Sequence, residues 1–151
     1  MDSFFAGQGF RIDGMIHLSP REAKAATDRG ALLVDLRPEY AVRMKTFALP
    51  DVLCLEQREL MLAPERVPSD RPLILADSVG VESKRAVALL LERGHANVAN
   101  LIGGMVEWEG DGMPTQVDPG ELWVGECACK LRPRKDYWKV ARQSDEPEPK
   151  P

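Results

Sequence analysis

The sequence is poor in the residues that build disulfide-stapled or metal-rich proteins. Its 151 residues include three cysteines and two histidines, and aromatic residues make up 6% of the chain. Three cysteines in a chain of this length do not form a disulfide framework, because one of them would be left without a partner. We therefore expect a reduced, cytoplasmic protein that carries no cofactor.

Long apolar runs and a strong excess of one charge are also missing. No run approaches the roughly 18 apolar residues of a membrane-spanning helix. The opening residues, MDSFFAGQGF, have neither the basic nor the long apolar region of a signal peptide. A net charge of −4 gives no case for a nucleic acid or a membrane surface as partner. With 44% apolar and 29% charged residues, the chain has the composition and length of a single globular domain.

Short apolar runs alternate with helical patterns along most of the chain. The helix that follows the first run has Ser19 as its expected N-cap, Pro20 in its first turn and Glu22 to complete a capping box. Strands alternating with helices at this spacing predict an α/β fold: a mostly parallel five-stranded sheet with helices on both faces. The five expected strands are residues 15–18, 31–36, 52–55, 73–76 and 97–101, and the expected helices are 19–29, 56–62, 83–93 and 103–109.

The stretch 72–93 contains the candidate functional loop. Its apolar run at 73–76 is short enough for a strand that is buried on both faces. From Ser83 to Arg93 the apolar residues fall on one helical face, and Gly94 supplies the stop. A strand, a short loop with a glycine and a helix N-terminus form the arrangement in which α/β proteins place ligands and chemistry.

This stretch and a later one resemble the rhodanese-like domain. The active loop of that family reads Cys-x-x-Gly-x-Arg-Ser after a buried strand, and a Gly-Gly-x-x-x-Trp segment followed by Gly-x-Pro comes near its end. Gly80 and Ser83 match the loop, and 103–108 and 112–114 match the later segments. The resemblance implies a rhodanese-like domain at residues 15–116. An N-terminal extension (1–14), a C-terminal extension (117–142) and a disordered tail (143–151) would flank it.

The loop departs from the family pattern at the two positions that carry its chemistry. Asp77 stands where the family has its cysteine nucleophile, and Glu82 stands where it has an arginine. A carboxylate cannot carry sulfur as a persulfide, although it can accept hydrogen bonds from the loop's own N–H groups. Glu82 would repel thiosulfate by about 1–4 kcal/mol at 4–6 Å. The two-domain members of the family have one half with Asp in place of the loop cysteine, and this chain resembles that non-catalytic half.

The expected function is therefore that of a catalytically inactive binding or regulatory module connected with sulfur transfer, and not that of an enzyme. Its partner would be an active sulfurtransferase or another sulfur-handling protein. The expected recognition surface is the equivalent of the active loop, which comprises Asp77, Ser78, Val79, Gly80, Val81, Glu82 and Ser83.

Four other residues in the expected domain carry groups that could take part in chemistry. Asp35 and Arg37 belong to a segment that resembles the family's Asp-x-Arg-x-x-x-Glu-Tyr/Phe, and we expect them to form an ion pair that supports the neighbouring loop. Cys54 alternates with apolar residues in a predicted strand, which predicts a small buried side chain and not a reactive thiol. His17, at a strand end without acidic or cysteine neighbours, is expected to be structural.

The two ends of the chain leave alternatives open. Cys127 and Cys129 would permit a sulfurtransferase or thiol-redox enzyme, half of a metal site in an accessory protein, or a strand-like extension that packs on the domain. Since four zinc ligands are not evident, we expect no metal. The basic stretch 130–142 is interpreted as a solvated face. Phe4, Phe5 and Phe10 would dock on the domain or on a partner, or belong to a loose leader.

Overall fold

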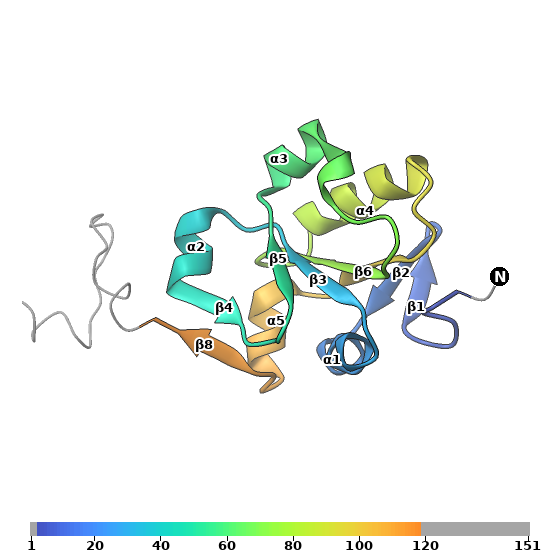
Figure 1. Ribbon diagram of the computed structural model, residues 1–151. Helices are drawn as coiled ribbons and strands as arrows, with labels where there is room; N and C mark the ends of the chain where they lie inside the picture. Colours follow the sequence, from blue (N-terminus) through green and yellow to red (C-terminus); the bar gives the residue numbers. More distant parts are fainter. Residues whose placement is uncertain (1–2, 119–151) are drawn as a thin grey trace, which may run out of the picture.

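The computed structural model describes residues 3–118, and these residues form an α/β fold around one main sheet (Figure 1). The sheet has the strand order β1-β2-β7-β6-β3-β5, and every neighbouring pair is parallel except β1 with β2. The predicted mostly parallel sheet is thus confirmed. Its strands are β1 (Phe10–Ile12), β2 (Met15–Leu18), β3 (Leu32–Asp35), β5 (Val52–Cys54), β6 (Leu73–Ala76) and β7 (Val98–Leu101).

The sheet has one strand more than the expected five because the chain before residue 15 also pairs. Asp13 and Gly14 both have positive φ, 52° and 79°, which is the backbone of a two-residue type I′ hairpin turn. This turn folds β1 back along β2, with Phe10 opposite His17 and Ile12 opposite Met15. Residues from the predicted N-terminal extension therefore form an edge of the main sheet.

Helices cover both faces of the sheet (Figure 1): α1 and α5 lie on one side and α3 and α4 on the other. A separate antiparallel pair, which sequence reasoning did not predict, joins β4 (Lys45–Phe47) to β8 (Thr115–Val117). The helices are α1 (Pro20–Asp28), α2 (Glu39–Met44), α3 (Gln57–Leu62), α4 (Glu82–Glu92) and α5 (Gly104–Gly110), with a 3₁₀ turn at Pro64–Arg66.

Helix α1 begins as its sequence predicted. The Ser19 hydroxyl accepts a hydrogen bond from the Glu22 N–H at 3.2 Å, and the Glu22 carboxylate accepts one from the Ser19 N–H at 2.9 Å. This reciprocal pair is a capping box, and it satisfies two backbone donors that a helix start otherwise leaves without partners. The second Glu22 oxygen accepts from the Gly9 N–H at 3.1 Å, which ties the N-terminal segment to α1.

The core has two parts because successive residues of each central strand point to opposite faces of the sheet. Leu33 and Ile74 pack under α1 and α5, whereas Val34 and Leu75 pack under α3 and α4. Phe5 is buried in the first part, and the backbone of Phe4 donates to the Asn97 side chain at 2.9 Å. The N-terminal aromatics are therefore divided: Phe5 enters the core, and Phe10 lies half-exposed on β1.

Several predicted features lie outside the described residues. They are Cys127 and Cys129, the basic stretch 130–142 and the tail 143–151. Within residues 3–118, no helix is long and apolar enough to cross a bilayer.

Candidate functional site

The candidate site lies at the carboxyl edge of the parallel strands, where the chain leaves neighbouring strands in opposite directions. After β6 it turns towards the face covered by α4, and after the adjacent β7 it turns towards the face covered by α5 (Figure 1). In α/β proteins, ligands commonly bind where the chain diverges in this way at the carboxyl ends of parallel strands. The loop 77–81 connects β6 to α4 at this position.

Asp77 fills this loop with its own side chain. One carboxylate oxygen, Oδ1, accepts a hydrogen bond from the Gly80 N–H, and the other, Oδ2, accepts from the Glu82 N–H at 2.7 Å. The Ser83 hydroxyl lies 3.4 Å from Oδ1. The residue is buried, so its negative charge depends on these donors and on the N-terminus of α4 in place of water. The loop's N–H groups are thus occupied by an anion from the chain itself.

The first turn of α5 holds the loop from behind. The Met105 N–H donates to the Asp77 carbonyl at 2.9 Å, and the Val106 N–H donates to the Ser78 carbonyl at 3.1 Å. Such a close approach requires glycine at the helix start, because a Cβ on Gly104 would lie 2.3 Å from the Asp77 carbonyl oxygen. The Gly-Gly segment of the sequence is therefore the support on which the loop rests.

Substituting Gly104 by alanine is expected to displace the loop as well as to destabilise the protein. Gly104 has φ +58°, and Gly112, with φ +75°, has no atom within 4 Å of a built Cβ. Gly112→Ala is therefore a matched control. Its free energy of unfolding should fall only by the about 1–2 kcal/mol that a left-handed backbone conformation costs an alanine. Gly104→Ala should lose more in urea unfolding and should also shift the NMR amide signals of Gly80 and Glu82. If both variants lost the same free energy of unfolding and the Gly80 and Glu82 signals did not shift, α5 would not be what supports the loop.

Behind the loop, a line of buried polar side chains crosses from α4 to β2. The Ser83 hydroxyl donates to Asn100 Oδ1 on β7, and Asn100 Nδ2 lies 3.2 Å from His17 Nδ1 on β2. The half-exposed Phe10 ring stacks on the imidazole with 5.4 Å between centroids. Burial lowers the pKa of His17, Lys84 lowers it further, and Asp13 opposes both. Because its pKa is lowered from 6.5, His17 is neutral at physiological pH.

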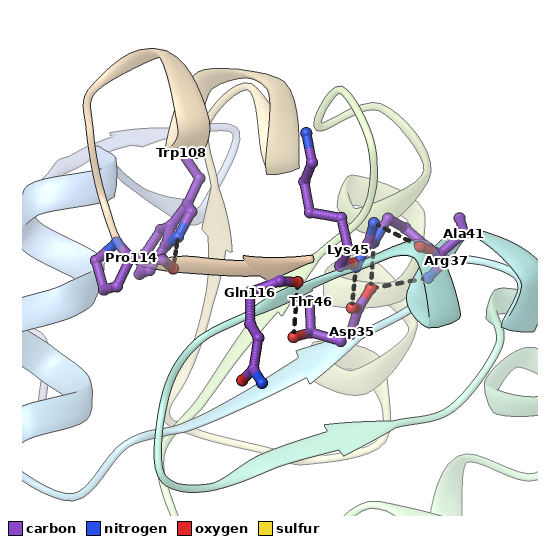
Figure 2. A network of polar contacts seen from close by, with 8 residues as sticks. All are labelled: Asp35, Arg37, Ala41, Lys45, Thr46, Trp108, Pro114 and Gln116. Carbon is purple, nitrogen blue, oxygen red and sulfur yellow. Dashed lines mark hydrogen bonds and ion pairs between the residues drawn. The ribbon is translucent and has the colours of Figure 1, made fainter. Parts of the chain in front are cut away.

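Asp35 and Arg37 form the expected ion pair, and it is buried (Figure 2). The pair is bidentate: Arg37 Nε lies 2.9 Å from Asp35 Oδ1, and Nη2 lies 2.7 Å from Oδ2. The same guanidinium donates to the Lys45 carbonyl at 2.7 Å and to the Ala41 carbonyl at 3.4 Å. Since these carbonyls belong to β4 and α2, the pair anchors the whole connection after β3.

Two further contacts in Figure 2 hold β8, one to β4 and one, just before the strand, to α5. The buried Trp108 of α5 donates its indole N–H to the Pro114 carbonyl at 2.8 Å, and the Thr46 hydroxyl donates to the Gln116 carbonyl at 3.4 Å. The tryptophan and the Gly-x-Pro segment of the sequence are thus joined by a hydrogen bond between α5 and the residue that precedes β8.

Cys54 is exposed, and the prediction that it would be buried was wrong. It is the last residue of β5, which lies at an edge of the sheet and has only β3 as a neighbour. Alternation with apolar residues indicates burial only where a strand is covered. Partial desolvation raises the pKa of the thiol, the charge of Asp35 raises it further, and Arg37 lowers it. Cys54 is therefore a protonated, weakly nucleophilic thiol at neutral pH.

Sequence reasoning did not single out Asn100 as a site residue, although it joins the loop to β2. The available signal was a polar side chain within a strand that is otherwise apolar and fully buried, since such a group needs partners. Within residues 3–118, no group of three His, Cys, Asp or Glu side chains could hold a metal ion.

The family model and the sequence relatives of this chain agree on one family. The family model described as the rhodanese-like domain matches residues 19–111. A sulfurtransferase from Allochromatium vinosum is 29% identical over 97 residues, which are 64% of this chain and 89% of the relative. The thiosulfate sulfurtransferase GlpE of Haemophilus influenzae is 30% identical over 95 residues, 60% of this chain and 85% of that enzyme.

The fold agrees with this assignment. A rhodanese-related protein from Thermoplasma volcanium superposes with a TM-score of 0.60 at 17% identity, covering 68% of this chain and 98% of that one. Since the family match spans more than half of the sequence and the fold is shared, the chain belongs to the family of rhodanese-like domains.

Proposed function

We propose that this protein is a catalytically inactive rhodanese-like module that binds a partner in sulfur transfer. One observation carries the proposal: both oxygens of the buried Asp77 carboxylate accept hydrogen bonds from N–H groups of its own loop. In this proposal Asp77 occupies the place of the family's cysteine nucleophile, and Glu82 that of its arginine. The relatives named as sulfurtransferases support the connection with sulfur chemistry.

The chemistry of sulfur transfer explains why this loop would not catalyse the reaction. A cysteine thiolate attacks the outer sulfur of thiosulfate, the S–S bond breaks, and sulfite leaves with the bonding electron pair, which gives Cys-S-S⁻. A carboxylate has no sulfur with which to form that bond. Asp77 also presents negative charge at the point where thiosulfate would bind. Glu82, half-exposed in the first turn of α4, adds a second negative charge, which Arg85 at 3.8 Å partly offsets.

The same loop offers a surface to a partner. Val79 and Val81 each expose more than half of their side chains, next to Glu82. Val106 on α5 is similarly exposed, and its N–H is bonded to the Ser78 carbonyl, so it lies beside the loop. Apolar side chains with a carboxylate suit a protein surface better than a small anion. We propose a cytoplasmic sulfur-handling protein or an active sulfurtransferase as the partner.

The test is sulfur loading followed by mass spectrometry. Three chains are compared, all with Cys54→Ser so that the exposed thiol cannot contribute signal. They have the wild-type loop (called wild type below), Asp77→Cys, and the double change Asp77→Cys/Glu82→Arg. Each is incubated with thiosulfate and separately with a persulfide donor. Wild type should gain no sulfur, whereas the double variant should gain one sulfur atom on the introduced cysteine, because a thiolate would then occupy the loop's donors without the charge of Glu82.

Peptide mapping separates the alternatives. Sulfur on Cys127 or Cys129 of the wild-type chain would refute the inactive module and identify a transferase with a relocated thiol. Stoichiometric bound metal that is lost on Cys127→Ser/Cys129→Ser would instead favour a metal-binding accessory protein. Absence of sulfur from the wild type and from both loop variants would contradict the idea that the loop keeps the family's anion site.

A further inference from the structure

The buried polar line behind the loop contains a titratable residue and two groups whose hydrogen bonds can reverse. Neither is needed to hold Asp77 in place. Four side chains from four different segments, Asp77, Ser83, Asn100 and His17, follow one another at hydrogen-bond distance, and none is more than 6% exposed. One of the four, His17, has an ordinary pKa near neutrality. Asn100 and Ser83 are groups that can reverse the direction of their hydrogen bonds by rotation.

In this arrangement, the orientation of the Asn100 amide determines the direction of its two hydrogen bonds. Asn100 Nδ2 is a donor, so the facing His17 Nδ1 accepts and the ring proton resides on Nε2. Asn100 Oδ1 accepts the single proton of the Ser83 hydroxyl. The same hydroxyl also faces Asp77 Oδ1 at 3.4 Å, but it has one proton, so donation to the nearer Asn100 leaves only a weak bond to Asp77.

We propose that these residues form a proton-controlled relay in which uptake of a proton by His17 Nδ1 changes the hydrogen bonding of Asp77. With a proton on Nδ1, two donors would face each other at the position where Asn100 Nδ2 now lies. The amide turns over, so that Oδ1 accepts from His17 and Nδ2 donates to the Ser83 oxygen. The Ser83 proton then turns to Asp77 Oδ1. One proton is taken from solvent, and no covalent bond other than the new N–H changes.

The groups that face His17 set the range of pH in which the relay works. Lys84 on α4 disfavours the imidazolium, Asp13 in the β1–β2 turn favours it, and the Phe10 ring is stacked on the imidazole. Burial is the largest influence and lowers the pKa of His17, so the relay responds below the ordinary value of 6.5. The unfolded chain binds this proton first, and stability is therefore lost as the pH falls from 6.5 through the folded-state pKa.

The relay does not depend on whether the loop binds a sulfur-handling partner. It connects the surface at β1 to the loop after β6 through the interior of the domain. The Gly80 N–H should report its action, because it shares Asp77 Oδ1 with the Ser83 hydroxyl. A stronger Ser83 bond weakens the Gly80 bond, whereas the Glu82 N–H bonds to the other oxygen and should respond less.

The test is an NMR pH titration of the full ¹⁵N-labelled chain carrying His95→Gln, which leaves His17 as its one histidine. At neutral pH the ring nitrogens should show the proton on Nε2. On acidification the Gly80 amide proton should move upfield with the midpoint of the His17 ring, and the Glu82 amide should move less. Asn100→Ala and Ser83→Ala should each abolish the Gly80 response at that midpoint while His17 still titrates. Either variant suffices if the other fails to fold.

Asn97→Ala provides the matched control. Its side chain holds the N-terminal segment and lies outside the line, so coupling between His17 and Gly80 should persist. Four results would each overturn the relay: a neutral ring with its proton on Nδ1, a Gly80 signal that stays constant while His17 titrates, coupling that survives both Asn100→Ala and Ser83→Ala, or unfolding before His17 takes up its proton.

Discussion

Asp35→Ala is expected to lower the free energy of unfolding by about 3–5 kcal/mol, because it leaves the guanidinium of Arg37 buried without its counter-ion. Asp35 is 1% exposed and Arg37 5%, and three hydrogen bonds to the Asp35 carboxylate would be lost together. Small domains are stable by only about 5–15 kcal/mol. Urea unfolding at pH 7 should therefore show a large drop in midpoint or a chain that no longer folds.

Asp51→Ala is the matched control for this loss. Asp51 pairs with Arg71 at 2.7 Å, the same distance as the closest contact of the buried pair, but the Asp51 side chain is 61% exposed. Removing it should cost about 0–1 kcal/mol, since water replaces the lost partner. The double variant Asp35→Leu/Arg37→Met should recover part of the loss, because no uncompensated charge remains, although the Lys45 and Ala41 carbonyls lose their donor. Similar losses for Asp35→Ala and Asp51→Ala would show that burial of the pair is not what matters.

Phe5→Ala is expected to cost about 3–5 kcal/mol, although the residue lies well outside the segment that matches the family. The ring is 1% exposed and packs in the part of the core that lies under α1 and α5, in edge-to-face contact with Phe4 at 5.0 Å. Truncation would leave a cavity beneath α1 that the surrounding backbone cannot fill. Chemical denaturation monitored by circular dichroism measures the loss.

Phe10→Ala is the control from the same segment. Phe10 is 49% exposed and contributes mainly through its cross-strand partner His17, a contact worth about 0.2–1 kcal/mol. If the two phenylalanines cost the same, the N-terminal segment would not be part of the core. If Phe5→Ala costs what is expected, residues before 15 belong to the folding unit, and truncation at the family boundary should yield an unstable protein.

The local elements could be predicted because their signals are local. The capping box of α1 depends on Ser19 and Glu22, three residues apart, and forms as predicted. The apolar runs that became β3, β6 and β7 are buried on both faces, so their composition alone indicates a central strand. The same reasoning failed for Cys54, since an edge strand carries the same pattern without the same cover.

The predicted site was incomplete for a similar reason. The loop 77–83 and its hydrogen bonds to Asp77 follow from a strand, a glycine and a helix start, all of which are contiguous in sequence. Ser83 and Asn100 are 17 positions apart in the sequence, and the packing of α4 on β7 brings them together. Asn100 and His17 are 83 positions apart, and the parallel pairing of β2 with β7 brings them together. No local pattern specifies such a contact.

By itself, then, the sequence determined the class of fold, the family resemblance and the absence of a cysteine from the loop, because each of these is written in short, contiguous patterns. Tertiary structure decided which side chains are covered and which distant groups meet. It placed Phe5 in the core, left Cys54 at an open edge and aligned Asp77, Ser83, Asn100 and His17 in one buried line. These outcomes depend on how the strands are ordered in the sheet, which is a property of the packed chain as a whole.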